Sequence, residues 1–223
     1  MTGKLFAEAI AKFSLGVVLV GALLFLPAGT FDYPQAWLFL GILFIPMFLA
    51  GLVMMAKNPA LLRERLNAKE EQKEQDTVVK LSGLMFLLGF VAAGLNVRFQ
   101  WIIWPGWVSK AGAVAFLLSY ALYAEVLREN TYLSRTIKVQ ENQQVISTGL
   151  YGIVRHPMYS ATVILFLSMP LVLGSVISFV IFLMYPFLIA RRIANEEQVL
   201  ERGLEGYAEY KQKVKYRLIP FVW

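Results

Sequence analysis

Long, nearly continuous runs of apolar residues alternate along the chain with short loops and two polar segments. A run of about 17–25 apolar residues predicts a transmembrane helix, because a helix of that length crosses the hydrocarbon core of a bilayer. Four runs meet this length, and they occupy residues 5–26, 34–56, 81–97 and 110–127. The pattern therefore predicts four membrane-crossing helices before residue 128.

Two polar segments, at residues 57–80 and 129–154, interrupt this pattern. The first mixes charges of both signs with Leu61, Leu62 and Leu66, which predicts a short amphipathic helix lying on the membrane surface. A solvated helical linker explains the same composition. Both interpretations remain open from the sequence.

Two shorter apolar runs follow the second polar segment, at residues 159–173 and 176–190. Each has about 15 residues, below the roughly 20 that span a bilayer comfortably. The Leu-Gly-Ser stretch at 173–175 offers a turn between them, and Pro170 and Pro186 offer kinks. The two runs predict a short, tightly packed helical hairpin.

These elements predict an all-α polytopic membrane protein with four transmembrane helices and a C-terminal helical hairpin, five to six membrane segments in all. We divide it into an N-terminal transmembrane region, residues 1–127, which includes the amphipathic loop 57–80, and a C-terminal module, residues 128–223. No alternation of strands and helices with a Gly-rich turn occurs, so a nucleotide-binding domain of the Rossmann type is excluded.

Composition supports the membrane assignment. Hydrophobic residues make up 58% of the 223 residues and charged residues only 16%, against about 25% charged in a typical soluble domain. Because the chain has no cysteine, it has neither disulfides nor thiolate metal sites. With a single histidine in addition, a zinc site is not expected.

The distribution of positive charge predicts the orientation. Of the 21 Lys and Arg residues, only Arg98 and Lys110 lie in loops 28–33 and 98–110. Cytoplasmic loops of membrane proteins are enriched in Lys and Arg. Both termini and both polar segments are therefore expected in the cytoplasm, and the net charge of +6 needs no nucleic-acid partner.

One stretch, STGLYGIVRHPMY at residues 147–159, contains the only histidine, His156, where the second polar segment meets the hairpin. A polar site at the mouth of a membrane domain is a functional hypothesis by default. Folding the hairpin brings His156 and Tyr159 close to Arg192 and Glu196, which share a helix face because they are four residues apart. An ordinary salt bridge at a helix end is the alternative explanation of the latter pair.

The spacing of several motifs is more specific. They read Gly149-x-Tyr151-x3-Arg155-His156-Pro157-x-Tyr159, then Arg192-x3-Glu196-Glu197, then Gly206-Tyr207-x2-Tyr210, then Arg217-x2-Pro220. Over residues 130–223 this arrangement resembles the isoprenylcysteine carboxyl methyltransferase family. The upstream NPALLRERL, residues 58–66, resembles the bacterial branch of that family.

The resemblance implies an integral membrane methyltransferase that binds S-adenosylmethionine in a cytosolic pocket of the C-terminal module. It implies a lipophilic or lipidated substrate, with membrane lipid as the surrounding partner, and a bacterial inner membrane as the location. By the same resemblance, Arg192 is the catalytic residue that holds the substrate carboxylate. The matching cofactor-binding positions are Gln140, Gln143, Gln144, Val145, Ile146, Tyr151, His156, Pro157, Met158, Tyr159 and Glu196.

The chemistry agrees with these roles, since a carboxylic acid with a pKa near ~4 is already ionised at pH 7 and needs no base. His156 is then a neutral binder rather than a general base. Three alternatives remain open from the sequence: a methyltransferase acting on a phospholipid or other lipid amine, an NADPH-dependent membrane reductase of the sterol reductase type, and a non-catalytic membrane protein.

Overall fold

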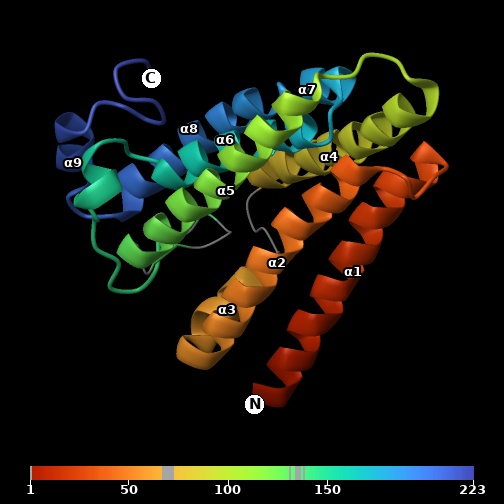
Figure 1. Ribbon diagram of the computed structural model, residues 1–223. Coiled ribbons are helices and arrows are strands. Elements are labelled where there is room, and N and C mark those ends of the chain that lie inside the picture. Colours follow the sequence, from red (N-terminus) through yellow and green to blue (C-terminus); the bar gives the residue numbers. More distant parts are fainter. Residues whose placement is uncertain (1, 67–72, 131, 134–136, 138) are drawn as a thin grey trace.

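The computed structural model describes residues 2–66, 73–130, 132–133, 137 and 139–223, and the regular elements of this part of the chain are helices joined by loops (Figure 1). Five segments are long and apolar enough to cross a membrane, α6 is a shorter apolar helix, and the predicted all-α polytopic fold is confirmed. The protein is an integral membrane protein. Its elements are α1 (Thr2–Ala28), α2 (Pro34–Lys57), α3 (Pro59–Leu66), α4 (Lys73–Phe99), α5 (Gly106–Glu129), the 3-10 helix η1 (Gly149–Gly152), α6 (Pro157–Val172), α7 (Val176–Phe182), α8 (Tyr185–Gly203) and α9 (Tyr207–Lys213).

The first polar segment is divided between two helices. Its first part forms α3, and its last part is the beginning of α4, which starts at Lys73 and not near residue 81. Residues 67–72 lie outside the described part of the chain. Within the described residues, the part of this segment before α4 therefore forms the single short helix α3, and its predicted place at the membrane surface stays a prediction.

The second arm of the predicted hairpin differs from the expectation. Instead of one run over residues 176–190, α7 ends at Phe182 and α8 begins at Tyr185, with Pro186 in its first turn. Proline is tolerated in a first turn because its missing N–H has no intrahelical partner there. The new helix then continues to Gly203, so α8 carries Arg192 and Glu196 on one rigid element.

The core of the bundle is aromatic. Phe39 of α2 contacts Phe90 of α4 and Phe116 of α5, with ring centroids 5.6 Å and 5.9 Å apart, and Phe90 also meets Phe182 of α7 at 6.0 Å. All four rings are buried. Such edge and tilted contacts add to the burial of apolar surface, so these rings join the N-terminal helices to the hairpin.

The loops between the helices meet at one end of the bundle. The hydroxyl of Tyr33 donates to the carbonyl of Leu173 over 2.7 Å, and the backbone N–H of Trp104 donates to the carbonyl of Gly174 over 3.1 Å. The C-terminus and α9 lie at a different end, beside the lower turns of α5 and α8 (Figure 1). The loops predicted to be poor in positive charge are thus separated from the polar segments.

Close packing of α1 against α4 depends on Gly94. A Cβ atom added there would lie 2.5 Å from the carbonyl oxygen of Leu24 and 3.0 Å from Cβ of Pro27. We expect Gly94→Ala to destabilise the protein by about 1–3 kcal/mol, because the two helix backbones must separate. Gly83→Ala, in the same helix with nothing within 4 Å of the added atom, is the control and should be neutral or slightly stabilising. Unfolding midpoints in detergent measure both, and equal midpoints for the two variants would contradict the packing argument.

Candidate functional site

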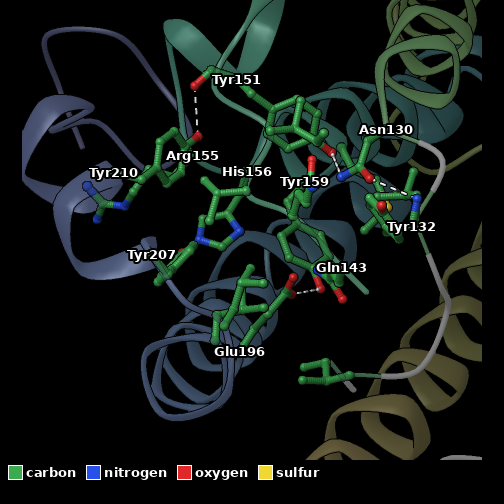
Figure 2. Close-up of a pocket in the computed structure, with 18 of the residues that line it drawn as sticks. Asn130, Tyr132, Gln143, Tyr151, Arg155, His156, Tyr159, Glu196, Tyr207 and Tyr210 are labelled. Carbon is green, nitrogen blue, oxygen red and sulfur yellow. Dashed lines mark hydrogen bonds between the residues drawn. The ribbon is translucent and has the colours of Figure 1, made fainter. Parts of the chain in front are cut away.

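A polar cavity lies where the second polar segment, the start of α6, α8 and α9 meet (Figure 2). Its empty volume, counted together with the part open to solvent, is about 810 Å³. The residues that line it are Asn130, Tyr132, Leu133, Ile137, Gln143, Gln144, Val145, Ile146, Tyr151, Arg155, His156, Met158, Tyr159, Arg192, Glu196, Leu200, Leu204, Tyr207 and Tyr210.

The hydroxyl of Tyr159 connects the two charged residues of α8 that face this cavity. It donates to Oε2 of Glu196 over 2.5 Å and accepts from Nε of Arg192 over 2.9 Å. Tyr159 is buried in the first turn of α6. The expected proximity of Tyr159, Arg192 and Glu196 is therefore present, but their connection runs through Tyr159 and is not a simple salt bridge between neighbours on α8.

Glu197, next to Glu196 in the sequence, faces away from the cavity into a buried ionic cluster. Its side chain is 3% exposed. Oε1 accepts from Nε of Arg155 over 2.7 Å and lies 3.2 Å from Nε2 of His156, and Oε2 accepts from Nε and Nη2 of Arg217 over 3.0 Å and 2.9 Å. Of the two adjacent acids, Glu196 is thus the one that can contact a ligand, and Glu197 holds the surrounding structure.

This cluster fastens the C-terminal segment beside the cavity. Nη1 of Arg155 donates to the carbonyls of Val214 and Lys215 over 2.7 Å and 2.8 Å. The backbone N–H groups of Arg155 and His156 donate to the carbonyls of Tyr216 and Arg217 over 2.9 Å and 3.0 Å. Because His156 is held at both its backbone and its ring, it forms a fixed wall of the cavity, as Figure 2 shows.

The predicted glutamine strip is partly in the cavity. Gln143, Gln144, Val145 and Ile146 line it, whereas Gln140 does not. The backbone N–H of Gln140 donates to Oε1 of Gln143 over 2.8 Å, and its side chain donates to the carbonyl of Tyr132. Gln140 therefore shapes the loop, and its expected place in the cavity wall is corrected.

Pro157 was predicted to bind the cofactor, but it does not line the polar cavity. It is fully buried as the first residue of α6 and lines an apolar groove and not the polar cavity. The groove lies along the α6 face that presents Ser160, Ile164 and Leu167, while Met158 and Tyr159 face the cavity. Consecutive residues of a helix point in directions about 100° apart, which accounts for the difference.

Three tyrosines complete the wall: Tyr151, which was predicted to bind the cofactor, and Tyr207 and Tyr210, which the sequence placed only in a motif. The hydroxyl of Tyr151 accepts from Nδ2 of Asn130 over 2.9 Å, and the hydroxyl of Tyr210 donates to the carbonyl of Tyr151 over 2.7 Å. Burial raises the pKa of Tyr151 to about 12 and raises the pKa values of Tyr207 and Tyr210 further above the usual 10.0. All three therefore remain neutral at physiological pH.

Tyr207 has a further property. Its hydroxyl is buried and has no hydrogen-bond partner among the described residues, although the side chain lines the cavity. A buried hydroxyl without a partner is unfavourable. The sequence signal of Tyr207 was the Gly-Tyr-x2-Tyr motif at residues 206–210. Asn130, Tyr132, Leu200 and Leu204 also line the cavity and carry no comparable motif.

These features define an integral membrane protein with a polar cavity, partly open to solvent, at one end of a helical bundle. Residues 112–202 match the Isoprenylcysteine carboxyl methyltransferase (ICMT) family. A protein-S-isoprenylcysteine O-methyltransferase B of Arabidopsis thaliana is 28% identical over 159 residues, which are 65% of this chain and 80% of the plant protein. The predicted resemblance to the isoprenylcysteine carboxyl methyltransferase family is confirmed.

Two further comparisons concern the fold and a second class of protein. The solved structure of the eukaryotic intramembrane Ras methyltransferase ICMT has a TM-score of 0.61 at 18% identity, covering 96% of this chain and 77% of that chain. A Delta(14)-sterol reductase of Mus musculus is 33% identical over 91 residues. That match spans 40% of this chain but only 22% of the reductase, so it relates one module and not two whole proteins.

Proposed function

We propose that this protein is an S-adenosylmethionine-dependent membrane methyltransferase whose acceptor is the carboxylate of a lipophilic, isoprenylcysteine-like molecule. The observation that carries the proposal is the cavity in which Arg192 and Glu196 meet at one tyrosine hydroxyl. The cation suits an anionic acceptor and the anion suits a cationic cofactor. The family match and the plant relative support the enzyme class.

The lining of the cavity fits S-adenosylmethionine group by group. Glu196 suits the cofactor ammonium or its ribose hydroxyls, and the unpartnered hydroxyl of Tyr207 offers a donor. Tyr151 and His156 offer ring faces to the adenine or the sulfonium cation. Gln143 and Gln144 add amide donors and acceptors. Bound in this cavity, the cofactor supplies an activated methyl group.

The residues of the chain then have only to position the acceptor. A carboxylate is the nucleophile without deprotonation at pH 7, and Arg192 can bind it through charge-assisted hydrogen bonds. The product is a methyl ester, because one carboxylate oxygen takes the methyl group while the sulfonium becomes a neutral thioether. Well-oriented approach contributes about 7–11 kcal/mol in comparable cases, so holding the carboxylate in line is the main task of Arg192.

An apolar groove supports a lipophilic acceptor. It runs along the other face of α6 and encloses about 1660 Å³, including its open side, with Ile153, Ile164, Phe187 and Leu218 among its lining residues. Most of its wall is hydrocarbon, which suits a prenyl or acyl tail. We propose that the tail occupies this groove while the carboxylate reaches past the start of α6 to Arg192.

The positions of the lining residues in the sequence support a division of the chain into a catalytic part and a transmembrane part. All of those that form the polar cavity belong to residues 130–210, which supports a catalytic module at 128–223 beside a transmembrane region at 1–127. The charge asymmetry of the loops supports a cytoplasmic active site and cytoplasmic termini. We place the protein in a bacterial inner membrane.

Two competing activities are weaker fits. A lipid amine must lose a proton on methylation, but the only histidine, His156, directs Nε2 at Glu197. A reductase must hold the 2′-phosphate of NADPH, which calls for a cluster of cations with available donors. Among the described lining residues of this cavity only Arg155 and Arg192 are Lys or Arg, and Arg155 is engaged by Glu197 and backbone carbonyls, so a cation cluster is lacking there.

Isothermal titration of the detergent-solubilised protein tests the cofactor assignment. We expect saturable binding of S-adenosylmethionine, and about tenfold or greater weakening in Glu196→Gln, which removes one charged hydrogen-bond acceptor. Glu205→Gln is the control, since this exposed acid lies outside the cavity. Binding of NADPH without binding of S-adenosylmethionine would favour the reductase. If neither ligand binds, both the methyltransferase and the reductase assignments are contradicted.

A further inference from the structure

Asn130, the residue that follows α5, joins the end of a membrane-spanning helix to the wall of the polar cavity. Its Oδ1 accepts from the backbone N–H of Tyr132 over 3.0 Å, and its Nδ2 donates to the hydroxyl oxygen of Tyr151 over 2.9 Å (Figure 2). Asn130 and Tyr151 both line the cavity. Asn130 therefore contacts the polar end of a tyrosine that was predicted to bind the cofactor.

The two hydrogen bonds of the Asn130 side chain have a fixed direction. A backbone N–H can only donate, so the amide oxygen must face Tyr132 and the amide nitrogen must face Tyr151. The amide nitrogen can also only donate, so the hydroxyl oxygen of Tyr151 accepts and its own hydrogen points elsewhere. Burial raises the pKa of Tyr151 to about 12, so the hydroxyl keeps this hydrogen at neutral pH. Asn130 thus leaves Tyr151 oriented as a hydrogen-bond donor.

Other residues hold the backbone around Tyr151. Both carboxylate oxygens of Glu129 accept from the backbone N–H of Leu150, over 3.3 Å and 3.0 Å. The carbonyl of Tyr151 accepts from the hydroxyl of Tyr210 over 2.7 Å. Because these bonds fix the main chain on both sides of the tyrosine, the contribution that belongs to Asn130 alone is the direction of the hydroxyl.

We propose that Asn130 is a positioning residue for S-adenosylmethionine, because it turns the Tyr151 hydroxyl so that this hydroxyl donates a hydrogen bond to the cofactor. The inference rests on the proposed function, which places the cofactor in this cavity. The cofactor has acceptors in its carboxylate, its ribose oxygens and its adenine ring nitrogens. A carboxylate can only accept, so Glu196 serves donors of the cofactor, whereas Tyr151 serves one of these acceptors.

Isothermal titration of S-adenosylmethionine into the full-length protein in detergent tests this role with Asn130→Asp. The change replaces the amide nitrogen by an oxygen, so the new carboxylate accepts from Tyr151 and turns the hydroxyl hydrogen away from the cofactor. We expect the affinity to fall about two- to tenfold, which is the contribution of one hydrogen bond. The added negative charge alone would have the opposite effect, because the cofactor carries a net positive charge.

Asn142→Asp is the matched control for this variant. Asn142 is exposed in the same polar segment and lies outside the cavity, so the same chemical change there should leave the affinity equal to that of the wild type. A loss of affinity as large in Asn142→Asp as in Asn130→Asp would contradict the proposal.

A double-mutant cycle separates positioning from a general structural effect. Tyr151→Phe keeps the ring, removes the hydroxyl and should weaken binding by a similar factor. Both changes remove the same hydrogen bond to the cofactor, so the double variant should bind no more weakly than Tyr151→Phe alone, whereas independent losses multiply. If Asn130→Asp does not fold, Asn130→Ala takes its place in the cycle, because it also frees the hydroxyl to rotate.

The outcomes distinguish this inference from the cofactor assignment. Unchanged affinity in Tyr151→Phe would show that its hydroxyl does not bond the cofactor, and losses that multiply would show that Asn130 does not act through it. Either result would overturn the inference while the binding of S-adenosylmethionine by the wild type stands. If the wild type does not bind S-adenosylmethionine, the cofactor assignment and this inference both fail.

Discussion

Replacing Arg192 by alanine is expected to lower kcat for methyl transfer by about 10²–10³-fold, the loss seen when one preorganised donor to a reacting group is removed. The guanidinium adjoins Tyr159, whose hydroxyl holds Glu196. Because Glu196 keeps that hydrogen bond in the variant, the affinity for S-adenosylmethionine should change only a few-fold. Transfer of label from the cofactor to N-acetyl-S-farnesylcysteine measures kcat, and isothermal titration measures the affinity.

Two variants make the Arg192 experiment decisive. Arg191→Ala is the matched control, since Arg191 is exposed, precedes Arg192 on α8 and does not line the cavity. Arg192→Lys keeps a positive charge but loses the planar donor pair, and we expect it to remain strongly impaired. Full activity of Arg192→Lys would show that a point charge is sufficient and would remove the positioning role.

Replacing Glu197 by alanine is expected to have the largest effect on stability. The carboxylate compensates Arg155 and Arg217 and adjoins His156 inside the protein, with a side chain that is 3% exposed. Removing one partner of a buried ionic group leaves uncompensated charge and typically costs about 3–5 kcal/mol. Glu197→Ala should therefore lower the unfolding midpoint strongly and release the segment after α9 to limited proteolysis.

The control for this experiment is Glu201→Gln, one turn further along α8. Glu201 bonds Nζ of Lys211 over 2.5 Å, but its side chain is 38% exposed. Exposed ion pairs contribute about 0–1 kcal/mol, so this variant should unfold close to the wild type. If the two variants lose equal stability, the buried cluster does not hold the C-terminal segment as argued.

The sequence was sufficient for the features that depend on long patterns. The apolar runs predicted the membrane helices, and the spacing of the motifs between Gly149 and Pro220 predicted the family. Continuous hydrophobicity and fixed spacings are properties of the chain itself, so they need no knowledge of tertiary contacts. The break between α7 and α8 was harder, because Pro186 is compatible with a kink and with a new first turn.

The site was harder to predict from the sequence where adjacent residues face different surroundings. Glu196 and Glu197 are equivalent by pattern, yet one faces the cavity and the other lies in a buried cluster with partners from residues 155 and 217. Only tertiary contacts decide between them. The position of Gln140 was hard to predict for a related reason: its loop has no periodicity that would show which glutamine side chain faces the cavity.

Residues 214–217 are hydrogen-bonded to Arg155 and His156, and these bonds determine the order in which parts of the protein mature during synthesis. The ribosome delivers the membrane helices first, and the segment that fixes His156 from behind emerges after all of them. Insertion into the bilayer must therefore precede maturation of the cavity. A nascent or prematurely terminated chain lacking residues 214–217 would sit in the membrane with its cofactor-facing wall unsupported.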